Sequence, residues 1–299
     1  MNNFLDKYKE CTLCARACKV NRALGEIGYC RSSTDVSVAR AALHHWEEPI
    51  ISGTRGSGTI FFCGCSLGCV YCQNSEISRG KSGKTVSVDR LSGIMNELQA
   101  KGAHNINLVT PTHYAPSIVE AVGKAREDGL SIPIAYNTSS YDSPETIEVL
   151  NGSVDIYLAD LKYHLSSTAK KYSAAENYPE AAKAAIEKMV LQRGSVRLEN
   201  GLLSSGVIVR ILLLPGHLAE AKLCCSYLLD KYGDDIYVSL MSQYTPMPDM
   251  EAPLNRRVTA REYGELCEYA LKKGLKNGFM QEKCSAEQTF IPSFDCTGV

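Results

Sequence analysis

Three closely spaced cysteines have the arrangement of an iron–sulfur site. They are Cys65, Cys69 and Cys72, spaced C-x3-C-x2-C in a stretch that also contains Gly64 and Gly68. Cysteine thiolates are the usual ligands of iron–sulfur clusters, and glycines allow the backbone to turn tightly around one. Three thiolates on three irons of a cubane leave the fourth iron open to a small molecule. A zinc site or a chance group of thiols is the alternative, although structural zinc usually takes four protein ligands.

A second group of cysteines lies near the N-terminus. Its members are Cys11, Cys14, Cys18 and Cys30, spaced C-x2-C-x3-C-x11-C. Four thiols suffice for a closed metal site. Structural zinc more often uses two separated C-x2-C pairs, so three packed cysteines with one distant partner favour a second iron–sulfur cluster. Zinc and four free thiols remain the alternatives. Cys63 is expected to be a small buried hydrophobic residue rather than a further ligand.

The first motif continues as Cys-Val-Tyr-Cys-Gln-Asn at residues 69–74. In this form it resembles the radical S-adenosylmethionine (SAM) superfamily. It is most similar to the pyruvate formate-lyase activating enzymes, which carry an aromatic residue between the last two cysteines and an asparagine two positions after them. Stretches at residues 11–22, 44–49, 241–246 and 254–257 resemble the PflX-like branch. The resemblance covers nearly the whole chain.

Short apolar runs alternate with helical patterns from residue 59 onward, which predicts an α/β fold. Repeated β-α units imply a parallel sheet with right-handed crossovers. Eight units would close a TIM barrel, so six predict an open, partial (βα)6 TIM-like barrel. This is also the radical SAM core fold that the resemblance implies. The expected strands are 59–63, 106–109, 132–136, 154–159, 207–214 and 236–240.

The chain is expected to have three parts. Residues 1–55 form a cysteine-rich N-terminal extension that binds a metal or cluster, and residues 56–246 form the radical SAM core. Residues 247–299 form a C-terminal extension of a helix and a tail, both packed on the core. Thr259 and Glu262 have the spacing of a capping box, which predicts the start of that helix.

Polar residues follow every predicted strand. In parallel α/β barrels the active site lies at the carboxyl ends of the strands, so these residues are expected to meet there. The polar ends are Cys65, Thr110 to His113, Asn137 to Ser139, Asp160 to Lys162, Pro215 to His217 and Ser242 to Tyr244.

Two cations near these ends suit a carboxylate, and SAM carries one. Lys162 shares a face with Asp160 in an extended chain, and the activating enzymes that the chain resembles have the same Asp-x-Lys after the fourth strand. A surface ion pair of little energetic consequence is the alternative. Arg210 lies within an apolar run, and a buried guanidinium requires an anion. That anion is Glu199 or Asp160, or, by resemblance, the methionine carboxylate of SAM.

The resemblance implies the other SAM contacts. An aromatic residue in the position of Tyr71 lies against adenine, the third-strand end lies near the ribose or methionyl group, and the sixth-strand end closes the adenine side. Many superfamily members bind the SAM amino group with Gly-Gly-Glu after the second strand, and here two threonines occupy that position. The expected SAM-binding residues are Tyr71, Thr110, Thr112, Asn137, Thr138, Asp160, Lys162, Arg210, Gln243 and Tyr244.

Several histidines are candidates for chemistry. His113 and His217 follow predicted strands, where a proton donor or a substrate contact would be useful; a solvated loop histidine is the alternative. The run from His44 to Glu48 is read as a packed tryptophan with polar neighbours, because adjacent side chains of an extended strand point to opposite faces. In the PflX-like branch this run is part of the pattern, so a place near the site remains open.

The resemblance implies a radical SAM oxidoreductase. A 4Fe-4S cluster would pass an electron to SAM, and the resulting 5′-deoxyadenosyl radical would abstract hydrogen, with flavodoxin or ferredoxin as electron donor. The implied substrate is a glycine of a glycyl radical enzyme, and a small molecule is the second possibility. An iron–sulfur or zinc protein without turnover, acting as a scaffold or redox sensor, is the third.

Composition excludes other classes of partner. A net charge of -1 gives no electrostatic basis for binding nucleic acid or an anionic membrane. The first residues lack the apolar core of a signal peptide, and no apolar run reaches the roughly 20 residues that span a bilayer. The 13 cysteines, grouped in tight spacings, favour metal or cluster binding in a reducing cytoplasm.

Overall fold

The computed structural model describes residues 4–79, 82–281 and 292–299. Within these residues the strands form one sheet in the order β10-β9-β8-β6-β5-β4-β2-β1-β3, and β7 pairs with β8 beside it. The strands are β1 (Val36–His44), β2 (Ser57–Phe62), β3 (Lys84–Val86), β4 (Ile106–Val109), β5 (Ile134–Thr138), β6 (Ile156–Asp160), β7 (Arg197–Glu199), β8 (Leu202–Leu212), β9 (Tyr237–Met241) and β10 (Gly278–Met280).

The sheet confirms the predicted open, partial barrel. The six expected strands correspond to β2, β4, β5, β6, β8 and β9, which pair in parallel. The sequence did not predict β10, which extends the parallel sheet at one end. It also did not predict β1 and β3, which extend the sheet antiparallel at the other end, or the short β7.

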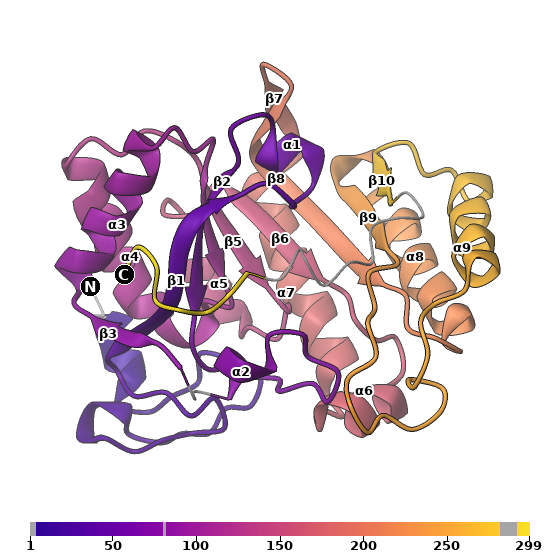
Figure 1. Cartoon of the computed structure of the whole chain (residues 1–299), viewed down its shortest axis with the longest axis horizontal. Coiled ribbons are helices and arrows are strands. Elements are labelled where there is room, and N and C mark those ends of the chain that lie inside the picture. The colour runs from indigo at the N-terminus through magenta and orange to yellow at the C-terminus, as the bar shows by residue number, and fades with distance from the viewer. Residues whose placement is uncertain (1–3, 80–81, 282–291) are drawn as a thin grey trace.

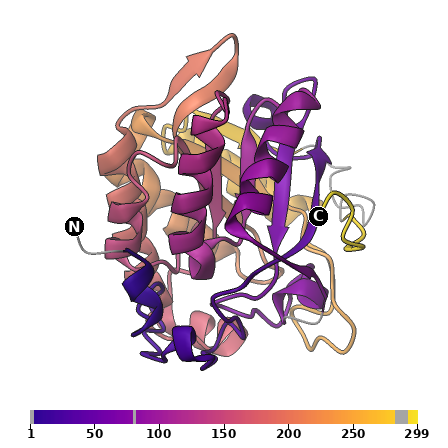
Figure 2. The same cartoon turned by 90° about the vertical axis from the view of Figure 1, so that its left-hand side faces the viewer.

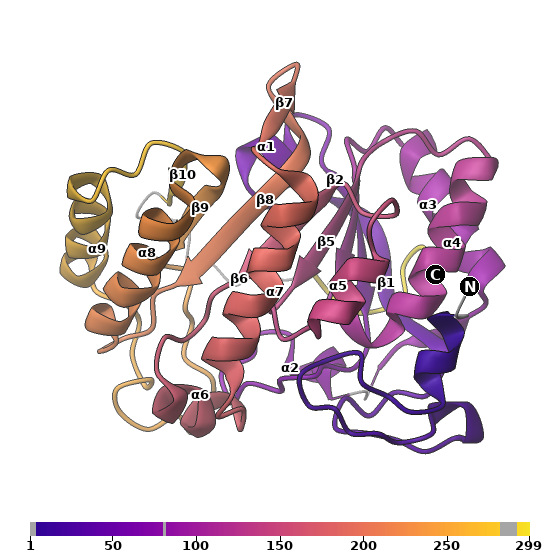
Figure 3. The ribbon, with the colours of Figure 1, turned by 180° about the vertical axis from the view of Figure 1, so that it is seen from behind.

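Helices cover the outer face of the sheet. Figure 3 shows α5, α7 and α8 in front of the strands, whereas Figure 1 shows the concave face from the other side. The α-helices are α1 (Pro49–Ser52), α2 (Ser75–Ser78), α3 (Val88–Ala100), α4 (Ala115–Glu127), α5 (Pro144–Val149), α6 (Ser166–Ser173), α7 (Tyr178–Arg193), α8 (Leu218–Tyr232) and α9 (Ala260–Lys272). The 3-10 helices are η1 (Phe4–Tyr8), η2 (Arg22–Leu24), η3 (Thr112–Tyr114) and η4 (Gly233–Asp235).

Alternation along the strands divides their side chains between the two faces of the sheet. One set packs under the helices in the main core. The other set points into the barrel, where Ala135, Leu158 and Ile208 pack with Ile51 of α1. The short helix α1 therefore closes the amino end of the barrel with apolar contacts. Asn137 follows Ala135 by two residues, and Arg210 follows Ile208 by two. The same alternation therefore directs both side chains into the barrel, near the carboxyl ends of β5 and β8.

The N-terminal segment joins the core at two places. Its last part is β1, which pairs with β2 through Ala42 and Thr59, so the expected boundary after residue 55 falls between two paired strands. The division into three parts stays a prediction. The earlier part lies below the carboxyl ends of the strands, at the same end of the molecule as α6 (Figure 2). There Cys14 forms an isolated β-bridge with Asp142.

The C-terminal extension contains the predicted capped helix and a segment beside β1. Thr259 and Glu262 form the capping box of α9, as the sequence predicts. Residues 292–299 run along β1, where Cys296 N–H donates to Ala39 O at 2.9 Å. Residues 282–291, which include Cys284 and part of the expected tail, lie outside the described residues. None of the described helices combines the length and the apolar character needed to cross a membrane.

Candidate functional site

A cavity of about 660 Å³ opens at the carboxyl ends of the strands. It is lined by the three closely spaced cysteines and by most of the residues expected to bind SAM. These are Cys65, Cys69, Cys72, Tyr71, Thr110, Asn137, Thr138, Asp160, Lys162, Arg210, Gln243 and Tyr244. Residues from five strand ends and from the cysteine loop therefore meet in one place.

Two glycines shape the cysteine loop that follows β2. Gly64 has a φ of 88° and Gly68 a φ of 65°, in the left-handed region that favours glycine. A Cβ atom on Gly64 would lie 2.7 Å from the carbonyl oxygen of Cys30. The glycine thus lets the cysteine loop pass close to the N-terminal segment. Cys63 is buried, as expected, and its thiol donates to the carbonyl of Ser82 at 2.5 Å.

The three thiols fit an iron–sulfur cluster by their chemistry. Burial, together with the neighbouring Cys69 and Cys72, raises the pKa of Cys65 to about 12. The Leu67 N–H donates to Cys65 Sγ at 3.4 Å, a kind of contact that tunes cluster ligands. In the described ranges no three His, Cys, Asp or Glu side chains converge closely enough to hold one ion. In a cubane each of the thiolates would bind a different iron.

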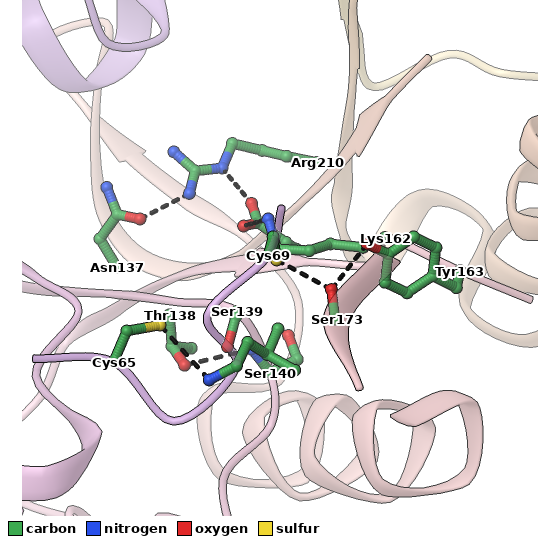
Figure 4. A network of polar contacts seen from close by, with 12 residues as sticks. Cys65, Cys69, Asn137, Thr138, Ser139, Ser140, Lys162, Tyr163, Ser173 and Arg210 are labelled. Atoms are coloured by element: carbon green, nitrogen blue, oxygen red, sulfur yellow. Dashed lines mark hydrogen bonds and ion pairs between the residues drawn. The ribbon is translucent and has the colours of Figure 1, made fainter. Parts of the chain in front are cut away.

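A buried group of charges lines the same cavity as the cysteines. Asp160 ends β6 directly beside Arg210 of β8 in the sheet register. Arg210 Nε donates to Asp160 Oδ1 at 2.8 Å, and Lys162 Nζ donates to Asp160 Oδ2 at 2.6 Å (Figure 4). Burial alone would raise the pKa of Asp160, but Arg210 and Lys162 hold it below its usual range. Of the two protein anions expected for Arg210, the structure shows Asp160 as its partner and not Glu199, which is exposed on β7.

Glu47 belongs to this group, although no binding role for it follows from the sequence. The interpretation of its run, His44 to Glu48, as a packed tryptophan with polar neighbours is wrong, because the run lines the cavity and Trp46 is 59% exposed. Its Oε1 accepts from Asn107 Nδ2 at 2.9 Å and from Asn137 Nδ2 at 3.4 Å. Its Oε2 lies 3.5 Å from Arg210 Nη1. Burial raises the pKa of Glu47 and of its neighbour Glu48 even though Arg210 is near. Asn107, Asn137 and Arg210 lie within apolar strand patterns in the sequence, and these buried polar side chains indicate that an acidic partner is buried beside them.

Only one of the two threonines expected at the SAM amino group lines the cavity. Thr110 lines the cavity, with a φ of 58°. Thr112 is buried in η3, away from the cavity lining, and its hydroxyl lies 3.4 Å from that of Thr138. Thr138 in turn donates to the buried carboxylate of Asp142 at 2.5 Å. Thr112 therefore supports the wall of the cavity from behind.

Neither candidate catalytic histidine reaches the cavity. His113 is buried, and its Nε2 donates to the Cys63 carbonyl at 2.7 Å. Burial, with Arg22 nearby, lowers its pKa to about 3, so the ring stays neutral. His217 lies at the start of α8, with Nε2 3.0 Å from the hydroxyl of Tyr172. Both candidate histidines therefore make contacts outside the cavity lining, and His113 is buried and not a solvated loop residue.

Aromatic rings form the side of the cavity expected to hold adenine. The ring of Tyr71 lies edge-on to that of Tyr244, with centroids 6.1 Å apart. The hydroxyl of Tyr244 donates to the carbonyl of Leu254 at 2.6 Å. Gln73 Nε2 donates to the Gln243 carbonyl at 3.0 Å, which ties the cysteine loop to the end of β9.

Two further polar residues connect to the cysteine loop without a signal in the sequence. The hydroxyl of Tyr163 lies 2.7 Å from that of Tyr71 and 2.7 Å from that of Ser173. Ser173 Oγ donates to Cys69 Sγ at 2.9 Å (Figure 4). Ser173 reaches the loop from the end of α6, and Tyr163 from the segment between β6 and α6.

The N-terminal cysteines lie in one part of the molecule. Cys11 and Cys30 are buried, Cys14 is half-buried and Cys18 is exposed. Burial raises the pKa of Cys14 above its usual range, and the nearby thiols of Cys11, Cys18 and Cys30 add to the rise. The Cys11 N–H donates to Val20 O at 3.0 Å, which closes the loop that carries the first three cysteines.

Known proteins resemble this chain over most of its length. The family model described as the Radical SAM superfamily matches residues 59–220. The uncharacterized protein MJ0674 of Methanocaldococcus jannaschii is 30% identical over 282 residues, which cover 90% of this chain and 76% of that protein.

Solved structures that match part of this chain include SuiB of Streptococcus suis, 12% identical with a TM-score of 0.49, matching 77% of this chain and 49% of SuiB. Another is anSMEcpe with bound AdoMet, 10% identical with a TM-score of 0.49, matching 70% of this chain and 57% of that chain. The chain therefore spans about half the length of these solved structures.

Proposed function

Because this chain belongs to the radical SAM superfamily, we propose that it activates a glycyl radical enzyme by abstracting hydrogen from a glycine. The family implies a 4Fe-4S cluster and SAM, which together supply a 5′-deoxyadenosyl radical when bound. Cys65, Cys69 and Cys72 would hold the cluster. A flavodoxin or ferredoxin would supply the electron.

One observation carries this proposal: the three thiols and the polar strand ends line the same cavity. A scaffold or redox sensor needs thiols but no second wall of polar side chains. The cavity combines both, in a fold whose strand ends form the active site. The residues proposed to hold the cluster and SAM therefore line one cavity.

Lys162 is our proposed partner for the SAM carboxylate. An ammonium carries three N–H donors, and in the described part of the chain one of them is directed to Asp160. The guanidinium of Arg210 is already directed to Asp160, Asn137 and Glu47. Arg210 would then act by holding Asp160 in place, and Lys162 would make the contact to SAM.

The remaining contacts follow the cavity wall. Tyr71 and Tyr244 would lie against the adenine ring, with Gln243 beside them. Asn137 and Thr138 would face the ribose or methionyl group. Thr110 offers its hydroxyl and carbonyl to the amino group, in the position where many superfamily members carry Gly-Gly-Glu.

A protein substrate is supported by the apolar rim of the cavity. Trp46 and Met280 line the cavity and are 59% and 38% exposed. Exposed apolar side chains next to a functional cavity are typical of surfaces that receive another chain. They suit an extended peptide segment that carries the target glycine into the cavity.

The test is product formation by the protein after anaerobic reconstitution with iron and sulfide. Dithionite and SAM are added with a purified pyruvate formate-lyase-type enzyme, and 5′-deoxyadenosine is measured by mass spectrometry. The proposal expects product with the wild type, none with Cys69→Ser, and a glycyl radical signal in electron paramagnetic resonance (EPR). Product without a glycyl radical would point to a small-molecule substrate. Loaded iron without SAM binding would contradict radical SAM chemistry.

A further inference from the structure

A continuous chain of hydroxyl groups ends on a sulfur atom of the cysteine loop. It runs from Tyr71 to Tyr163 at 2.7 Å, from Tyr163 to Ser173 at 2.7 Å, and from Ser173 to Cys69 Sγ at 2.9 Å. The side chains of Tyr71, Tyr163 and Ser173 are each more than nine-tenths buried. Solvent therefore does not replace these contacts.

The chemistry of a cluster ligand fixes the direction of this chain. A cysteine that binds iron is a thiolate and has no proton to give, so Ser173 must donate to it. The oxygen of Ser173 is then free to accept from Tyr163, and the oxygen of Tyr163 to accept from Tyr71. Hydrogen bonds in such a chain strengthen one another, and the last one ends on the sulfur.

Hydrogen bonds to the sulfurs are among the features that set the potential of an iron–sulfur cluster. Reduction adds negative charge, and a donor aimed at the thiolate stabilises the reduced form more than the oxidised form. We propose that Ser173 is a positioning residue that donates to Cys69 and thereby raises the reduction potential of the cluster. This inference rests on the proposed function, because it requires a cluster on Cys69.

Arg16 holds Ser173 in this position. Its guanidinium donates to the Ser173 carbonyl at 2.9 Å and to the Ala174 carbonyl at the end of α6. It also donates to the Ser66 carbonyl at 3.0 Å and to the Leu67 carbonyl at 3.3 Å, within the cysteine loop. One side chain thus joins the segment that carries the donor to the segment that carries the sulfur.

The position of Arg16 in the sequence extends the inference to the N-terminal segment. Arg16 lies between Cys14 and Cys18, and its guanidinium is 3.8 Å from the ring centroid of Tyr29. The four-cysteine segment therefore supplies the residue that orders the surroundings of Cys69. Disturbing that segment is expected to change the cluster potential through Arg16 and Ser173.

The test is an EPR-monitored redox titration of the reconstituted protein. The signal belongs to the proposed site if the Cys65→Ser, Cys69→Ser, Cys72→Ser triple variant lacks it. We expect Ser173→Ala to shift the midpoint potential to a more negative value and Ser173→Thr, which keeps the hydroxyl, to restore it. Tyr163→Phe is expected to make the midpoint potential more negative by a smaller amount. Arg16→Ala is expected to make it more negative as well, in protein with the same iron content as the wild type.

Matched controls separate this effect from general damage. Ser226 forms a comparable hydrogen bond with Tyr269 between α8 and α9, at 2.5 Å. Arg193 likewise donates to a backbone carbonyl, that of Val154 at 2.9 Å. Ser226→Ala and Arg193→Ala should leave the potential unchanged.

An unchanged potential in iron-loaded Ser173→Ala would overturn the inference and leave the proposed function standing. If Ser173→Ala fails to load iron, the midpoint potentials of Tyr163→Phe and Arg16→Ala test the inference instead. Unchanged potentials in both variants would overturn the inference. A wild type without the site-specific signal would instead overturn the proposed function, and the inference with it.

Discussion

The ammonium of Lys162 lies 2.6 Å from one oxygen of Asp160, whose other oxygen accepts from Arg210 at 2.8 Å. One carboxylate thus serves two cations, all three groups being largely shielded from water. Separating buried charges is costly when one partner is removed, because the remaining charge keeps its desolvation penalty. The stability of the cavity wall therefore depends on Asp160 more than on either cation.

Asp160→Asn is expected to lower the free energy of unfolding by about 3–5 kcal/mol, the range for breaking a buried pair. Urea unfolding followed by circular dichroism measures it. Glu148→Gln is the control, because Glu148 pairs with Lys188 at 2.9 Å on the exposed surface. An exposed pair is worth about 1 kcal/mol at most. Equal effects of the two substitutions would contradict the buried network.

Lys162→Met is expected to weaken SAM binding about tenfold or more. The substitution keeps the length of the side chain but removes a hydrogen bond to a charged group, worth about 1.5–3 kcal/mol. Titration calorimetry with the reconstituted protein gives the dissociation constant. Lys188→Met, on the exposed surface of α7, should bind SAM like the wild type. An unchanged constant for Lys162→Met would show that another group binds the carboxylate.

His113→Gln is expected to reduce the acid sensitivity of the fold. The pKa of His113 is about 3 in the folded protein and has a reference value of 6.5. Between these values the unfolded state binds a proton that the folded state does not, so this histidine lowers stability as the pH falls. The slope is about 1.4 kcal/mol per pH unit for one proton.

Glutamine can keep the donor to the Cys63 carbonyl without titrating. Unfolding free energies measured from pH 4 to 7 should therefore fall less steeply for the variant. Parallel curves for the two proteins would mean that His113 is charged in the folded state.

Gly64→Ala is expected to reduce iron loading and stability. Its Cβ would collide with the side chain of Ser32 and lie 2.7 Å from the Cys30 carbonyl, at a positive φ. Gly129→Ala is the matched control, since Gly129 also has a positive φ, 100°, but no atom within 4 Å of the added Cβ. Iron content after reconstitution compares the two, and similar loading would contradict the close approach of the two segments.

The N-terminal cysteines are expected to hold a second iron–sulfur cluster. The Cys65→Ser, Cys69→Ser, Cys72→Ser variant should retain about four irons per chain, and adding Cys14→Ser and Cys30→Ser should remove them. Iron and zinc are measured by mass spectrometry on the reconstituted protein. Zinc in place of iron would assign the segment a structural zinc site.

Local pattern predicted the parts of the molecule that depend on neighbours in sequence. The apolar runs identified the six parallel strands. The polar residues after them identified part of the cavity lining, including Thr110, Asn137, Thr138, Asp160, Lys162, Gln243 and Tyr244. The sequence did not assign Glu47 a role in the site because its partners Asn107, Asn137 and Arg210 lie far from it in sequence. His113 follows a strand like the cavity residues do, but η3 turns it into the interior. Which way a side chain turns after a strand depends on tertiary packing that no local pattern contains.

The edge of β1 that pairs with β3 is covered further along by the C-terminal residues of the chain. Beyond its pairing with β3, Ala39 O accepts from Cys296 N–H, and Ala41 N–H donates to Thr297 O at 2.9 Å. An uncovered strand edge offers its backbone to other molecules. Residues 292–299 therefore act as a barrier against self-association. Without them this part of the β1 edge would expose backbone groups that could pair with a strand of another molecule.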